Sequence, residues 1–161
     1  EILRDYKNTC LWLLDEGNDM KNNILEFIDN RIDSNRLIFA EKVSYAKHLE
    51  RIQHIDIALD TRIYNGHTTS IEMLQAGVPL VTLKGNHFSS RVSASILNTL
   101  GIKQLITKNN IEYKNKIISL IDKNYRNDTK TEIIRKLKTS KLLDTKYFCN
   151  NFSKKIQSIF T

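Results

Sequence analysis

The sequence has no apolar run near the roughly 20 residues that a membrane-spanning helix needs. Its start shows no basic region followed by an apolar stretch, so no signal peptide is expected. Cys10 and Cys149 are the only cysteines, too few for a disulfide framework, and Cys10 lies in an apolar run that predicts a small buried hydrophobe. These features predict a reducing, cytoplasmic location without a membrane.

The chain also lacks internal repeats, low-complexity linkers and a metal-ligand pattern. Its four histidines do not show zinc-ligand spacing with carboxylates or cysteines, so no metal and no other cofactor is expected. With 161 residues the chain is long enough for one domain with a sizeable core.

Acidic residues are scarce in the last third of the chain. Residues 101–161 hold 14 Lys and Arg against 5 Asp and Glu, whereas residues 1–100 hold 11 against 13. A basic tail can indicate a nucleic acid, an anionic lipid or an acidic partner. Here the charges are spread along helical patterns and are not clustered with aromatics, which favours solvated helix faces.

Short apolar runs alternate with longer helical patterns along the chain. The runs predict five strands, at residues 10–14, 36–40, 56–60, 79–83 and 104–107. Helices are predicted between them, two of them ending at Gly77 and Gly101, and the chain after Asn109 predicts three helices. This order predicts an α/β fold with a Rossmann-like parallel sheet, whose ligands bind at the carboxyl ends of the strands.

The most informative strand end is residues 60–69, Asp-Thr-Arg-Ile-Tyr-Asn-Gly-His-Thr-Thr. Gly66 permits a close turn, and His67, Thr68 and Thr69 then form the first helical turn. Free backbone N–H groups, the helix dipole and two hydroxyl groups make an anion site there, which suits a diphosphate. The residues alone do not decide between such an anion site and a simple helix cap by Thr68 or Thr69; the two interpretations are equally favoured.

Glu72 lies one turn further along this helix, on the side of Thr68 and Thr69. A carboxylate below a phosphate site is well placed to accept hydrogen bonds from ribose hydroxyls. The other interpretation is a glutamate that complements the helix start.

Two further strand-end segments carry polar side chains. Tyr45, His48 and Arg51 recur every three residues on one helix, where they could stack on and hydrogen-bond a base, although the spacing alone favours an amphipathic helix. Lys84, His87 and Arg91 follow a later strand and could meet phosphate or sugar, or tie the loop to the sheet; these three are basic residues of a Gly-containing loop.

Together these segments resemble a known family, the O-linked N-acetylglucosamine transferases, including SPINDLY-like members. The resemblance rests on residues 56–61 (Asp-Ile-Ala-Leu-Asp-Thr), 65–69 (Asn-Gly-His-Thr-Thr), 76–82 (Ala-Gly-Val-Pro-Leu-Val-Thr), 90–92 (Ser-Arg-Val) and 100–101 (Leu-Gly). The spacing is free of gaps from Phe39 to Gly101, and a weaker similarity covers the rest.

The resemblance implies the C-terminal half of a two-lobed glycosyltransferase of the GT-B class. Such an enzyme transfers N-acetylglucosamine from UDP-GlcNAc to Ser or Thr of proteins, inverts the anomeric centre and needs no metal. By resemblance, Gly66, His67, Thr68 and Thr69 hold the diphosphate, and the last three act in catalysis by stabilising the leaving group.

The same resemblance assigns the nucleoside contacts. Glu72 stands where the family has a ribose-binding aspartate, and His48 and Arg51 match a histidine and an arginine that contact uridine. Tyr45 stands where many members have a lysine.

Some family features are not in these 161 residues. They are a first strand with its diphosphate-contacting lysine, the N-terminal catalytic lobe, and the tetratricopeptide repeats that bind protein acceptors. The chain is therefore expected to be a fragment or a degenerate relative, and a fragment is favoured. It would have a nucleotide-sugar-binding lobe at residues 1–126 and a helical extension packed on it at 127–161, and would be inactive alone.

Two other functions compete with this interpretation. A UDP-sugar epimerase, or another enzyme with the same architecture, would have a similar nucleotide half. A non-catalytic module could bind nucleic acid through residues 101–161, but that function gives no reason for the turn at Gly66–Thr69.

Overall fold

The computed structural model describes residues 1–29 and 31–160, and the chain divides into two compact units, residues 1–48 and residues 49 onward. Each unit has its own parallel sheet: one has the order β1-β2, the other the order β3-β4-β5. The division falls inside one helix, α3 (Tyr45–Ile52). Each unit is therefore described by itself.

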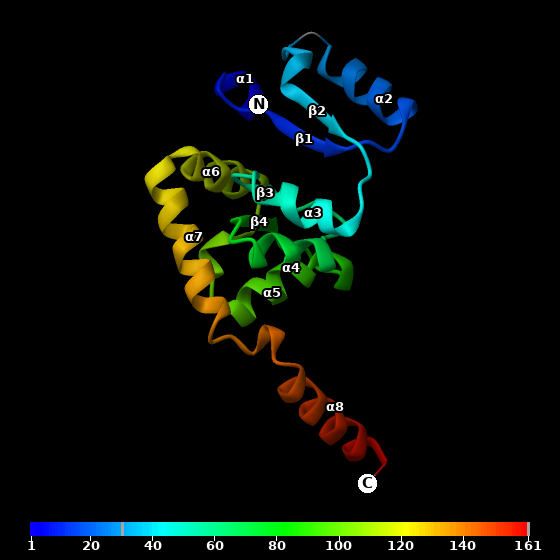
Figure 1. Cartoon of the computed structure of the whole chain (residues 1–161), viewed down its shortest axis with the longest axis vertical. Coiled ribbons are helices and arrows are strands. Elements are labelled where there is room, and N and C mark those ends of the chain that lie inside the picture. The colour runs from blue at the N-terminus through cyan, green and yellow to red at the C-terminus, as the bar shows by residue number, and fades with distance from the viewer. Residues whose placement is uncertain (30, 161) are drawn as a thin grey trace. The chain divides into compact units, whose positions relative to one another are not determined.

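The first unit is a strand–helix–strand motif (Figure 1). It contains α1 (Ile2–Asp5), β1 (Leu11–Leu14), α2 (Asn18–Ile28), the 3₁₀ turn η1 (Ser34–Arg36) and β2 (Leu37–Ala40). The strands pair in parallel from Leu11 opposite Leu37 to Leu14 opposite Ala40. A parallel pair needs a crossover of this kind, because its strands cannot be joined by a tight hairpin.

The guanidinium group of Arg36 ties the start of the chain to β2. It donates to the carbonyl oxygens of Leu3, Tyr6 and Thr9 at 2.6, 2.7 and 2.7 Å. Five fixed N–H donors make arginine suited to collecting several carbonyls at once. These bonds satisfy the backbone around α1, a four-residue helix that the sequence did not predict.

The second unit begins within α3, at Leu49, and is built on three short parallel strands. These are β3 (Ala58–Leu59), β4 (Leu80–Leu83) and β5 (Ile106–Thr107), with Ala58 opposite Leu80 and Thr82 opposite Ile106. The helices α4 (Thr68–Gln75), α5 (Val92–Leu100) and α6 (Asn110–Ile121) connect and follow them, and η2 (Phe88–Ser90) and η3 (Lys103–Leu105) are short 3₁₀ turns. All strand pairs are parallel, as the alternation predicts.

The core of this unit lies where the helices meet β4. Val78, Val81, Leu97, Leu105 and Leu120 are fully buried there. The next helix, α7 (Lys123–Leu137), contacts α4, α5 and α6 and adds the fully buried Ile133 (Figure 1). Burying one such aliphatic side chain contributes roughly 1.5–3 kcal/mol.

Two glycines end helices as the sequence predicts. Gly77 follows α4 and Gly101 caps α5, with φ of 76° and 77°. This left-handed conformation is unfavourable for a residue that has a β-carbon, and glycine adopts it without that cost.

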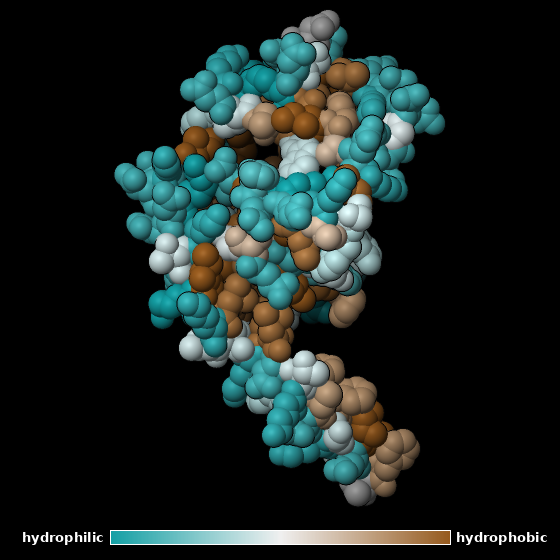
Figure 2. Space-filling model, viewed as in Figure 1, coloured by the Kyte–Doolittle hydropathy of each residue, from teal (hydrophilic) through white to brown (hydrophobic). Residues whose placement is uncertain are grey.

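The chain ends with η4 (Lys141–Leu143) and α8 (Thr145–Phe160). No residue of α8 is buried. Apolar side chains gather along one side of it in Figure 2, and Phe148, Phe152, Ile156 and Phe160 are among the exposed apolar residues. No described helix has the length and apolarity to cross a membrane.

The structure confirms the α/β class, the five strands and the three helices after Asn109. The expected burial of Cys10 is wrong: its side chain is exposed, because β1 begins one residue later and its two-stranded sheet offers little cover. The predicted boundary between residues 126 and 127 lies inside α7, and the chain divides into its two compact units between residues 48 and 49. The predicted division into a nucleotide-sugar-binding lobe at residues 1–126 and a helical extension at 127–161 stays a prediction.

Candidate functional site

The candidate site is the turn between β3 and α4, at the carboxyl end of β3. Asp60 is the first residue after the strand, and its N–H still bonds to the Val81 carbonyl of β4 at 3.0 Å. The turn therefore starts from a fixed point on the sheet. Ligands of open parallel sheets bind at this edge.

The Asp60 carboxylate joins the turn to the sheet from inside. One oxygen accepts the N–H of Gly66 at 2.8 Å, and the other accepts the hydroxyl of Thr82 on β4 at 2.5 Å. Asp60 is only 8% exposed and Thr82 is fully buried. The buried carboxylate fixes both donors in place. If the Gly66 N–H or the Thr82 hydroxyl moved away, it would lose its acceptor where no water replaces it.

Tyr113 of α6 completes this support. Its hydroxyl donates to the Asp60 carbonyl at 3.0 Å. Burial, and secondarily the charge of Asp60, raise the pKa of Tyr113 well above its usual range. The phenol therefore stays protonated and remains a donor.

The turn itself is held by η2, the 3₁₀ turn that follows β4. The Asn65 N–H donates to the Ser89 carbonyl at 2.8 Å, and the Ser89 hydroxyl donates to the Ile63 carbonyl at 3.2 Å. Asn65 also donates from its side chain to the Thr61 carbonyl at 3.0 Å. Ile63 has a φ of 74°, a rare conformation for a β-branched residue that costs of the order of 1–3 kcal/mol and persists only where surrounding bonds impose it.

A side chain at Gly66 would crowd two neighbouring hydroxyl groups, which would have to shift. A β-carbon there would lie 2.6 Å from the Ser70 hydroxyl and 2.7 Å from the Thr69 hydroxyl. Its carbonyl accepts the hydroxyl of Ser93 at 3.1 Å, and Ser93 lies 2.9 Å from the Ser70 hydroxyl. The turn is thus packed closely against α5 as well as the sheet.

His67 is held between two aromatic rings. Tyr64 stacks on it with 5.3 Å between centroids and 8° between planes, and Phe88 meets it edge-on at 6.2 Å. Its Nε2 is buried without a hydrogen-bond partner in the described chain, and so is the Oδ1 of Asn65. Buried polar atoms normally have partners, so these two atoms on either side of Gly66 make the turn a candidate ligand-binding site.

Thr68 and Thr69 open α4 with exposed side chains. Their N–H groups and that of Ser70 lie in the first helical turn, where no intrahelical acceptor is available. The first turn contains no acidic residue, so the positive end of the helix dipole is not neutralised there. Gly66, His67, Thr68 and Thr69 thus lie together at the start of α4, and their role as an anion site stays a prediction.

Glu72, one turn further along α4, is buried, with 6% exposure. Its predicted contact with ribose stays a prediction.

The three remaining predicted residues lie on α3. Arg51 is half-buried and belongs to the second unit, while Tyr45, 64% exposed, and His48, half-buried, belong to the first. Their spacing places them along one side of the helix. Their contact with a base also stays a prediction.

Sequence patterns missed the supports of this site. Asp60 ends a predicted strand and opens the segment 60–69, but no pattern indicates its bonds to Gly66 and Thr82, the conformation of Ile63 or the rings around His67. Of the basic residues after β4, Lys84, His87 and Arg91 are exposed, and Arg91 donates to the His87 carbonyl at 3.3 Å.

Comparison with known proteins identifies the family. Residues 1–152 match the family model for glycosyl transferase family 41. The chain belongs to this family. The resemblance drawn from the spaced motifs is thereby confirmed.

Curated relatives of this family 41 chain include a UDP-N-acetylglucosamine–peptide N-acetylglucosaminyltransferase of Caenorhabditis elegans, 29% identical over 153 residues. A probable enzyme of the same name from Arabidopsis thaliana, SEC, is 31% identical over 122 residues. These alignments cover 94% and 74% of this chain, but only 13% and 12% of the relatives. The chain therefore spans about an eighth of their length.

A solved structure shares the fold of the whole family 41 chain. The Thermobaculum terrenum O-GlcNAc transferase, in a K341M mutant, superposes with a TM-score of 0.89 at 25% identity. The match covers 98% of this chain and 31% of that one. It confirms the predicted fold class.

The support by Asp60 can be tested with a matched pair of substitutions. Asp60→Ala leaves the Gly66 N–H and the Thr82 hydroxyl buried without their acceptor, so we expect the free energy of unfolding to fall by roughly 2–4 kcal/mol. The control is Asp56→Ala, which removes an exposed carboxylate paired with Arg126 at 3.1 Å and should cost about 1 kcal/mol or less. Urea titration followed by circular dichroism measures both, and equal losses would show that Asp60 does not support the turn.

Proposed function

We propose that this chain is the donor-binding part of an inverting, metal-independent protein glycosyltransferase. It would hold UDP-GlcNAc while N-acetylglucosamine is transferred to Ser or Thr of a protein acceptor. The observation that carries the proposal is the fixed turn at Gly66–Thr69, with its unpartnered imidazole nitrogen and exposed threonines at a helix start. The names of the family 41 relatives support the sugar and the acceptor.

The proposed mechanism follows from the movement of charge. As the glycosidic bond breaks, negative charge develops on the leaving UDP. Donors already fixed at that position stabilise the transition state without reorganising, and one such donor is typically worth about 3 kcal/mol. Backbone N–H groups of the first turn, the two threonine hydroxyls and His67 would supply this stabilisation.

The same donors replace the divalent cation that could otherwise neutralise a diphosphate. No described group of three or more His, Cys, Asp and Glu side chains could hold a metal ion. The proposal assigns the neutralisation of the diphosphate to these donors and needs no metal and no other cofactor; its support is the chemistry of the turn.

The remaining contacts of the donor follow the family pattern. Glu72 would accept the ribose hydroxyls, and His48 and Arg51 would contact the uracil, with Tyr45 in place of the family lysine. A buried carboxylate can bind hydroxyl groups strongly, because each hydrogen bond to a charged acceptor is worth more in a dry environment.

The acceptor side would come from another part of a longer polypeptide. A second catalytic lobe would provide the acceptor histidine, and tetratricopeptide repeats would bind the protein substrate. The length of the family 41 relatives supports this, because the chain aligns to only 13% and 12% of the two relatives. We place such an enzyme in the cytoplasm, since two exposed thiols fit a reducing compartment.

The competing functions receive less support. The curated relatives carry transferase names, which argues against an epimerase. Part of the basic charge after residue 100 has structural partners, since Arg126 pairs with Asp56 and Lys136 pairs with Glu132. Nothing in the chain favours nucleic acid over the donor site.

UDP binding is the first test. UDP that binds only the folded chain must raise its melting temperature, by an amount equivalent to about 2.7 kcal/mol at a hundred times the Kd. His67→Ala and Thr68→Ala should each weaken UDP binding roughly tenfold, because each removes a donor to a charged oxygen. Thr131→Ala, at an exposed position of α7, is the matched control and should bind UDP like the wild type. Unchanged affinity in all three variants would make the turn purely structural.

Transfer activity is the second test. The 161-residue chain alone should incorporate no labelled N-acetylglucosamine into a protein acceptor, because positioning of the acceptor hydroxyl supplies much of the rate. A polypeptide that adds the upstream lobe should catalyse the transfer. Robust turnover by the isolated chain would refute the assignment of only the donor half to these residues.

A further inference from the structure

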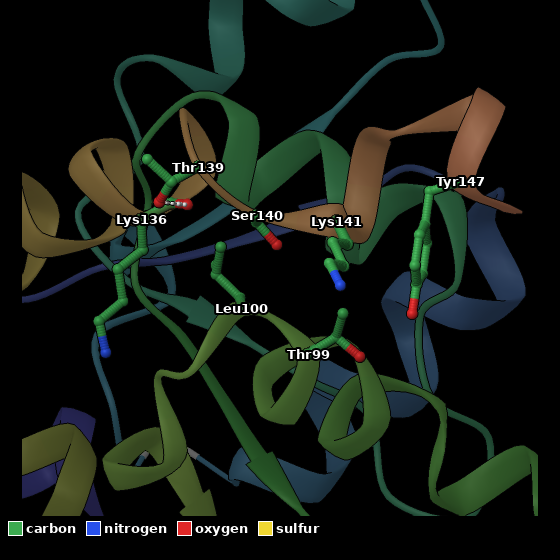
Figure 3. A pocket seen from close by; sticks show the side chains of 7 residues that line it. All are labelled: Thr99, Leu100, Lys136, Thr139, Ser140, Lys141 and Tyr147. Carbon is green, nitrogen blue, oxygen red and sulfur yellow. Dashed lines mark hydrogen bonds between the residues drawn. The ribbon is translucent and has the colours of Figure 1, made fainter.

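A cavity of about 490 Å³ is lined by residues that form no part of the candidate site (Figure 3). It is formed by the end of α5, the end of α7, the segment between α7 and η4, the first residue of η4 and the first turn of α8. Apart from one leucine, every lining residue carries an ammonium or a hydroxyl group: Thr99, Lys136, Thr139, Ser140, Lys141 and Tyr147. No carboxylate lines it, so its lining is cationic and rich in donors.

The two lysines differ in their partners. Lys136 pairs with Glu132 at 3.0 Å and donates to the Gly101 carbonyl, so its charge is matched and its position is fixed. The Lys141 ammonium lies 4.4 Å from the centre of the Tyr147 ring and has no carboxylate partner in the described chain. The nearby Asp144 is directed to the start of α8, where it accepts the Tyr147 N–H at 2.9 Å. Lys141 thus leaves one unmatched positive charge.

Three donors of the cavity remain available to a ligand. The Ser140 oxygen accepts the Leu142 N–H at 3.1 Å, which leaves its O–H free to donate. The Tyr147 hydroxyl has no hydrogen-bond partner among the described residues, and the Lys141 ammonium has three N–H groups. Figure 3 shows the polar ends of Ser140, Lys141 and Tyr147 pointing toward the space beside Thr99.

The threonines of the cavity offer acceptors. Thr99 already donates its proton to the Ser95 carbonyl at 3.0 Å, and Thr139 donates to the Lys136 carbonyl at 3.4 Å. Their oxygens can still accept a hydrogen bond from a ligand hydroxyl. The lining therefore suits a ligand that combines an anionic group with hydroxyl groups.

We propose that this cavity binds a small phosphate monoester. A phosphate group presents several strong acceptor oxygens and a charge that one ammonium and two hydroxyl donors can match. The volume lies within the range of small-molecule sites, and hydroxyl groups on the organic part would meet the threonine oxygens. None of its lining residues belongs to the diphosphate turn, so the site does not depend on the proposed transferase function.

Binding would also affect α8. This helix has no buried residue, and Tyr147 joins it to the cavity. A ligand held by Ser140, Lys141 and Tyr147 would connect the first turn of α8 to the segment that follows α7. Bound ligand therefore protects α8 from proteolysis.

The test uses glycerol 3-phosphate and inorganic phosphate, titrated into the 161-residue chain by calorimetry at constant ionic strength. Saturating UDP is present throughout, so that the probes cannot bind at the Gly66–Thr69 turn. If UDP does not bind, the titrations use the His67→Ala variant instead. Lys141→Met should weaken the binding of glycerol 3-phosphate roughly fivefold to tenfold, because it removes the unmatched charge. Tyr147→Phe keeps the ring beneath Lys141 and removes only the hydroxyl, so a smaller loss of roughly threefold is expected.

Lys138→Met is the matched control, since Lys138 is exposed, close in sequence and outside the cavity lining. It should bind glycerol 3-phosphate like the wild type, and the melting temperatures of all three variants confirm folding. Tighter binding of the ester than of inorganic phosphate, with slower tryptic cleavage of α8, supports the proposal. Equal weakening by Lys138→Met, affinity unchanged in Lys141→Met, or no binding of either probe would overturn it.

Discussion

The carboxylate of Asp60 is the contact on which the candidate site depends. It accepts the N–H of Gly66 and the hydroxyl of Thr82, and so fixes the turn after β3 to the neighbouring strand β4. Tyr113 holds the backbone of the same residue from α6. Because a donor deprived of this buried acceptor would cost about 1–3 kcal/mol, the position of Gly66, and with it the start of α4, has little freedom.

That rigidity is what an anion site at a helix start requires. The first turn of α4 provides N–H groups and the positive end of the helix dipole, and Tyr64 and Phe88 hold the imidazole of His67 beside them. A fixed arrangement of donors stabilises developing charge better than a mobile one, since no reorganisation accompanies the reaction. Under the proposed function, this geometry would stabilise a leaving diphosphate.

Local patterns in the sequence predicted the strands, the helices, the glycines that end α4 and α5, and the residues of the Gly66–Thr69 turn. Each of these depends on neighbours within a few positions. The bonds of Asp60, the conformation of Ile63 and the exposure of Cys10 depend on which distant segments meet, and no periodicity reveals that. The same limit applies to the two separate sheets, because β1 and β2 resemble β4 in composition although they pair only with each other.

The central claim is that UDP binds at the first turn of α4. Nuclear magnetic resonance of the ¹⁵N-labelled chain, titrated with UDP, observes the amide groups directly. The account predicts the largest shifts at the amides of Gly66, His67, Thr68, Thr69 and Ser70, since their N–H groups would meet the diphosphate. If UDP shifted only amides of the basic helices α6, α7 and α8, or none at all, the donor site would not be at this turn.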